Sequence, residues 1–138
     1  MEILVIDGQG GGIGRMLVEG LKRALEAQIC CVGTNAMATA AMLKAGASRA
    51  ATGENAAIVA CRTADVIVGP LGIVLADALF GEVTPAMAAA VAQSRAQRVL
   101  IPVDRCGNIV CGVQEGESTA TLVEQAVRVV ARLCANAR

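Results

Sequence analysis

Hydrophobic residues fall into two alternating patterns along this chain. Short continuous runs, such as Ile3-Leu4-Val5-Ile6, are typical of strands buried on both faces of a parallel sheet. Between these runs, apolar residues recur at the three- and four-residue spacing of amphipathic helices, first in the segment after residue 12. The alternation predicts an α/β, three-layer, Rossmann-like domain whose parallel sheet has helices on both faces.

The same patterns place the individual elements. Strands are predicted over residues 2–6, 29–32, 48–52, 66–68 and 98–101. Helices are predicted after the first glycine-rich turn, over residues 36–44, 54–62 and 73–79, from Thr84-Pro85 onward and after Ser118. A sixth strand is predicted over residues 109–113. Because it follows the short Cys106-Gly107-Asn108 connection, it is expected to be an antiparallel strand at the sheet edge.

A glycine-rich turn follows the first predicted strand. Glycine allows a turn at positive φ, a close approach of backbone to pyrophosphate, and tight packing of helix on strand. The helix after the turn directs its free N–H groups and its positive dipole end at an anion. The turn is therefore predicted to bind a nucleotide cofactor, although such a turn can also serve strand–helix packing alone. The predicted binding residues are Asp7, Gly8, Gln9, Gly10, Gly11, Gly12, Ile13 and Gly14.

Asp7 is the one acidic residue of this turn. A carboxylate there repels phosphate unless it coordinates a cation or pins the turn through backbone N–H groups, and we expect the pinning role.

An NTPase loop needs Lys and then Ser or Thr after its last glycine, where this chain has Arg15 and Met16, so ATP hydrolysis is not expected. The spacing G-x-x-x-G-x-G is similar to the cofactor loop of short-chain dehydrogenases, but the tyrosine that those enzymes need is absent.

The second predicted strand ends at Gly33-Thr34-Asn35, where an NAD site usually has an acidic residue for the ribose. Thr34 and Asn35 can hydrogen-bond a ribose, or they can cap the following helix.

Three further polar turns stand at predicted strand ends, where open α/β sheets bind ligands. They add Glu54, Asn55, Gly69 and Pro70 to the predicted cofactor-binding residues. An enzyme for a small metabolite, using Glu54 or Asp104 as acid or base, is an alternative.

Composition narrows the function further. The chain has no His, Tyr or Trp, which excludes a catalytic triad and an imidazole acid–base pair. Its 12 basic and 12 acidic residues balance without any basic run, so neither nucleic acid nor a membrane surface is an expected partner. The amino terminus does not have the pattern of a signal peptide, and a cytoplasmic location is predicted. A hydrophobic content of 55% favours a homodimer or higher homo-oligomer.

Six cysteines are expected to be thiols in a cytosolic α/β domain. Cys30 and Cys31 point to opposite faces of a strand, so they cannot share one metal. A thiol or metal function using Cys61, Cys106 and Cys111 is a further alternative. No metal is expected, since a site needs about four ligands and histidine is absent.

Six strings of residues carry a resemblance to a known family. They are VIDGQGGGIG, VGTNA, ATGENA, GPLG, TPAM and LIP, at residues 5–14, 32–36, 51–56, 69–72, 84–87 and 100–102. Together they resemble DUF3842, an uncharacterised family of small single-domain proteins from anaerobic bacteria, and they span nearly the whole chain. The resemblance implies a Rossmann-like fold and no established reaction. From the length of the chain, we expect residues 1–138 to form one domain. From its glycine-rich turn, we expect it to bind NAD(P) or another adenine nucleotide, as a sensor, carrier or enzyme subunit.

Overall fold

Five short segments form one parallel sheet in the computed structural model, which describes residues 1–103 and 105–137. The strands are β1 (Ile3–Asp7), β2 (Ile29–Gly33), β3 (Arg49–Thr52), β4 (Val66–Pro70) and β5 (Gln97–Ile101). Their order is β3-β2-β1-β4-β5, and every neighbouring pair is parallel. The three middle strands are buried along their whole length, as their continuous apolar runs predict.

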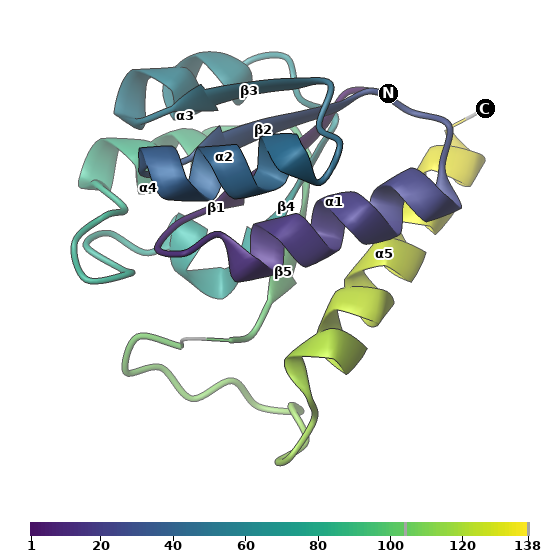
Figure 1. Ribbon diagram of the computed structural model, residues 1–138. Coiled ribbons are helices and arrows are strands. Elements are labelled where there is room, and N and C mark those ends of the chain that lie inside the picture. Colours follow the sequence, from purple (N-terminus) through teal and green to yellow (C-terminus); the bar gives the residue numbers. More distant parts are fainter. Residues whose placement is uncertain (104, 138) are drawn as a thin grey trace.

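Helices cover both faces of this sheet (Figure 1). The helices are α1 (Gly12–Ala24), α2 (Ala36–Lys44), α3 (Glu54–Ala60), α4 (Pro85–Gln93) and α5 (Thr119–Asn136), with a 3₁₀ turn, η1 (Leu71–Val74). Helices α1, α2 and α5 pack on the face that carries Ile3 and Val5, and α3, α4 and η1 on the face that carries Leu4 and Ile6. The predicted α/β, three-layer, Rossmann-like fold is confirmed.

Side-chain caps define where three of the helices begin. The side-chain oxygens of Asn35, Thr84 and Ser118 accept hydrogen bonds from backbone N–H groups of α2, α4 and α5, at 2.9, 3.1 and 3.1 Å. The capping interpretation of Asn35 is therefore confirmed. Helix α1 differs, because its N-cap residue is Gly11, which has no side chain to accept a bond.

The connection between β5 and α5 contradicts the prediction of a sixth strand. The structure forms no strand over residues 109–113, and the connection lies apart from the sheet (Figure 1). Left-handed backbone at Cys106, Gly107, Gly112 and Gly116 interrupts any extended segment. Ile109 is 90% exposed, so this stretch has no apolar face to bury against the sheet.

The predicted helix over residues 73–79 is also wrong. Only the 3₁₀ turn η1 forms after β4, because Asp77, Leu79 and Phe80 adopt left-handed backbone with φ of 65°, 55° and 60°. We call residues 75–83 the β4–α4 loop. Among the helices of the described residues, none is long and apolar enough to cross a membrane.

Candidate functional site

The glycine-rich turn lies at the point where the strand order reverses. The chain moves from β1 outward to β2 and β3, and then returns to place β4 on the other side of β1. Ligands of open α/β sheets bind at such a switch point, beyond the carboxyl ends of the strands. A cavity of about 150 Å³ opens here, lined by residues 7–13, Pro70 and Leu79. Pockets for drug-sized ligands are about 300–1,000 Å³, so this one has the size for a phosphate group and leaves the rest of a nucleotide outside.

Asp7 pins the turn from the end of β1. Its Oδ1 accepts the N–H of Gly8 at 2.8 Å, and its Oδ2 accepts the N–H of Gly14 at 2.7 Å. The residue is only 4% exposed. Gly14 lies in the first turn of α1, so the Asp7 carboxylate supplies the cap that Gly11 lacks. The predicted pinning role of Asp7 is confirmed.

Three glycines of the turn are required by packing inside the protein. Gly11 has φ of 73°, and a Cβ there would lie 2.8 Å from the backbone Cα of Ala38 in α2. A Cβ on Gly14 would lie 2.6 Å from the sulfur of Met42, also in α2. A Cβ on Gly8 would lie 2.5 Å from a side-chain oxygen. Gly11 and Gly14 thus let the start of α1 approach α2 closely, and Gly8 lets the turn approach Thr34 and Leu79.

Gly10 and Gly12 are different from the other glycines of the turn. A Cβ at either position would meet nothing within 4 Å, and neither has a positive φ. The backbone N–H groups of Gly10, Gly12 and Ile13 make no hydrogen bond within residues 1–103 and 105–137. All three residues line the cavity. The turn thus offers open backbone donors at the amino end of α1, the arrangement that binds anions.

Glu82 of the β4–α4 loop is a site residue that sequence reasoning missed. Its Oε1 accepts from the Gln9 N–H at 3.0 Å, the Thr34 hydroxyl at 2.8 Å and the Asn35 Nδ2 at 2.5 Å. Burial alone raises the pKa of the Glu82 carboxyl, but these three hydrogen bonds outweigh it and hold the pKa below its ordinary value. A carboxylate therefore does stand beside the end of β2, although it comes from a different part of the chain.

Of the two roles considered for Thr34 and Asn35, the structure shows the cap, and only at Asn35, whereas the Thr34 hydroxyl donates to Glu82. Asn35 caps α2 with Oδ1, while its Nδ2 also donates to the Gln9 carbonyl at 2.9 Å. The only signal for Glu82 in the sequence is a single acidic residue shortly before the Thr84-Pro85 helix start. That signal does not reveal which strand end the side chain reaches.

Other predicted site residues lie apart from the cavity. Glu54 and Asn55 are exposed at the start of α3, beyond β3, and do not line the cavity. Gly69 is closed in by packing, because a Cβ there would collide with the Ile6 carbonyl oxygen, whereas Pro70 lines the cavity. Asp104 lies outside the described residues.

The three cysteines of the thiol or metal alternative are placed in two different environments. Cys61 is in the core on the α3–α4 face, where burial raises its pKa to about 11. Cys106 and Cys111 are exposed on the connection between β5 and α5. Within the described residues, no three cysteine, aspartate or glutamate side chains are grouped to hold a metal ion.

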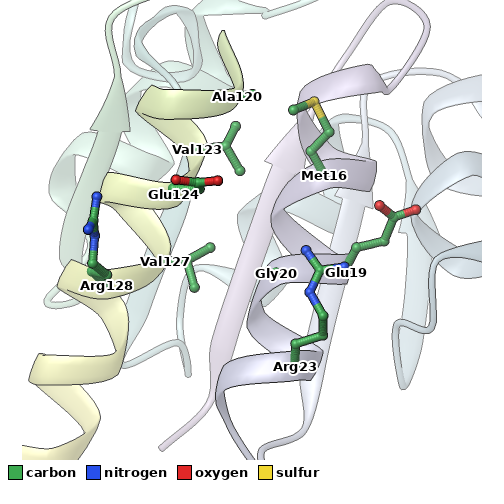
Figure 2. Close-up of a pocket in the computed structure, with 9 residues that line it drawn as sticks. All are labelled: Met16, Glu19, Gly20, Arg23, Ala120, Val123, Glu124, Val127 and Arg128. Atoms are coloured by element: carbon green, nitrogen blue, oxygen red, sulfur yellow. The ribbon is translucent and has the colours of Figure 1, made fainter. Parts of the chain in front are cut away.

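A larger groove of about 420 Å³ lies between α1 and α5, away from the glycine turn. In Figure 2, Val123 and Val127 project from α5 toward α1, and charged side chains stand around them. None of its lining residues belongs to the turn or to the β4–α4 loop, and none is a cysteine, serine or threonine. The lining residues are Met16, Glu19, Gly20, Arg23, Ala120, Val123, Glu124, Val127 and Arg128. We assign no chemistry to this groove.

Comparison with known proteins identifies a family and adds no reaction. A family model described as a domain of unknown function (DUF3842) matches residues 2–135. No curated protein and no solved structure matches the chain.

Proposed function

The chain belongs to this family, whose description assigns no function. From the site itself we propose that the protein binds an adenine nucleotide. The phosphates would be held by the glycine-rich turn, and the ligand would be NAD(P) or a related adenine nucleotide. The cavity is small, and no described residue of the predicted acid–base pair lines it, so a role as sensor, carrier or enzyme subunit fits better than a self-contained enzyme.

One observation carries the proposal: within residues 1–103 and 105–137, neither packing nor backbone conformation requires glycine at positions 10 and 12. Nothing lies within 4 Å of a Cβ at either position, and neither φ is positive. Glycine costs conformational entropy on folding, about 0.5–1 kcal/mol relative to alanine. A phosphate that approaches the backbone N–H groups of this turn would account for that cost, because a methyl group would stand in its way.

The alternatives have weaker support. Glu54, the described candidate for an acid or base, does not line the cavity. Cys61 is buried away from the two exposed cysteines of the β5–α5 connection, and burial keeps its thiol protonated at neutral pH.

The test is an alanine substitution at each open glycine. Gly10→Ala and Gly12→Ala should each weaken binding of ADP and of inorganic pyrophosphate by at least about tenfold in calorimetric titration, since one lost charge-assisted hydrogen bond has this size. Their melting temperatures should stay at or above that of the wild type, because no contact is disturbed. Glu54→Gln is the matched control and should leave both affinities unchanged.

Two results would contradict the proposal. One is a wild-type protein that binds neither ADP nor pyrophosphate at millimolar concentration. The other is a pair of folded alanine variants that bind both ligands as well as the wild type does.

We further propose that the protein is cytoplasmic and forms homodimers or higher homo-oligomers. Five large apolar side chains support association, since they are more than half exposed: Met1, Met37, Leu43, Phe80 and Ile109. Light scattering of the purified protein should therefore give at least twice the mass of one chain. A monomeric mass at high micromolar concentration would contradict the association.

A further inference from the structure

The β4–α4 loop carries a carboxylate to the edge of the glycine-rich turn. The loop starts beyond η1, and Glu82 near its end reaches Gln9 in the turn and both residues that follow β2. All three partners are uncharged, so these hydrogen bonds leave the negative charge of the carboxylate in place. In folds of this kind, the place beside the end of β2 is where the ribose of a nucleotide lies, with its hydroxyl groups on an acidic residue.

The two carboxylate oxygens of Glu82 are used unequally. Oε1 accepts all three hydrogen bonds, from the backbone of Gln9 and the side chains of Thr34 and Asn35. Oε2 makes no hydrogen bond with any residue that the structure describes. The side chain is half-buried and held in place by its first oxygen, so the second oxygen is an acceptor in a fixed position.

The backbone of the β4–α4 loop is held in a costly conformation to bring Glu82 there. Asp77, Leu79 and Phe80 are left-handed although none is glycine, a state that costs about 1 kcal/mol or more per residue. Buried Leu79 anchors the loop and lines the phosphate-sized cavity. The same loop thus contributes Leu79 to the cavity and places the Glu82 carboxylate beside it.

We propose that Glu82 is the ribose-recognition residue of the site, accepting a hydrogen bond on Oε2 from the 2′-hydroxyl of a nucleotide whose phosphates occupy the glycine-rich turn. This inference rests on the proposed function. It names the ligand more narrowly, as a ribonucleotide with a free 2′-hydroxyl. In sites of this kind, an acidic residue directly after β2 usually binds the ribose. This chain has no acidic residue there, and Glu82, which follows β4, takes that role in our proposal.

The experiment compares three ligands by calorimetric titration: ADP, 2′-deoxy-ADP and inorganic pyrophosphate. The wild type should bind ADP at least about tenfold more tightly than 2′-deoxy-ADP, the size of one hydrogen bond to a charged acceptor. Glu82→Gln keeps an oxygen for the Oε1 contacts and replaces Oε2 with an N–H₂ group that cannot accept. In this variant the preference should fall to about threefold or less, while pyrophosphate affinity stays within about twofold.

Asp77→Asn is the matched control. It removes one negative charge from the same loop, and asparagine tolerates the left-handed conformation of residue 77. This variant should keep the full preference for ADP. Thermal unfolding of both variants shows that each is folded under the titration conditions.

The outcomes separate this inference from the proposed function. If pyrophosphate and ADP bind but the wild type does not distinguish ADP from 2′-deoxy-ADP, or Glu82→Gln keeps the wild-type preference, the role of Glu82 is refuted and nucleotide binding stands. If neither pyrophosphate nor ADP binds, both proposals are refuted together.

Discussion

Replacing Asp7 with alanine should lower the free energy of unfolding by about 3 kcal/mol, because two backbone N–H groups lose their acceptor and an unpaired buried donor costs about 1–3 kcal/mol. The N–H groups belong to Gly8 and Gly14, at 2.8 and 2.7 Å from the carboxylate. Asp7 is 4% exposed, so water cannot readily replace it. The loss should also free the amino end of α1, which has no other side-chain cap.

Urea unfolding of the variant and the wild type measures this effect. Asp65→Ala is the control, since Asp65 also accepts a backbone N–H, from Glu2 at 2.6 Å, but lies in an exposed position. Its loss should be below about 1 kcal/mol, as water can satisfy the freed N–H. If the two substitutions lower the free energy of unfolding equally, then burial of Asp7 does not increase the cost of losing its hydrogen bonds.

Replacing Gly11 with alanine should cost about 2 kcal/mol or more of unfolding free energy, from left-handed strain of about 1 kcal/mol and a backbone collision. Gly11 has φ of 73°, and its new Cβ would lie 2.8 Å from Cα and 3.0 Å from the carbonyl oxygen of Ala38. Backbone atoms cannot rotate away as a flexible side chain can. Helix α2 must therefore shift as a unit, or the turn must open.

Gly10→Ala is the control for this prediction. It is one residue away in the same turn but meets nothing within 4 Å and has no positive φ. Its unfolding free energy should equal the wild-type value or exceed it by up to about 1 kcal/mol, because alanine loses less conformational entropy on folding and disturbs no contact here. If the two variants unfold at the same urea concentration, then the division of the turn into packing glycines and open glycines is wrong.

Much of the fold could be predicted because its signals are local. Continuous apolar runs place β1, β2 and β4, since only residues buried on both faces of a sheet can all be apolar. The caps Asn35, Thr84 and Ser118 place the starts of three helices, since the capping bond spans only three residues. Each of these features depends on residues that are neighbours in the chain.

The errors fall where a local pattern has no tertiary partner. Residues 109–113 are apolar enough for a strand, but they have no strand beside them and Ile109 faces solvent. Residues 73–79 have a helical composition, yet the β4–α4 loop turns through three left-handed residues. In both segments the surrounding structure, rather than the intrinsic preference of the residues, decides the backbone conformation.

The glycine-rich turn shows how far the sequence alone reaches and where the tertiary structure takes over. The sequence by itself determined that β1 is followed by a glycine-rich turn and a helix, because glycine content and hydrophobic spacing are properties of one short segment. Only the tertiary structure decided which glycines are needed for packing, since Ala38 and Met42 approach from α2. It alone also brought Glu82 to Thr34, 48 residues away, because contacts between distant segments depend on strand order and loop path, which no local pattern encodes.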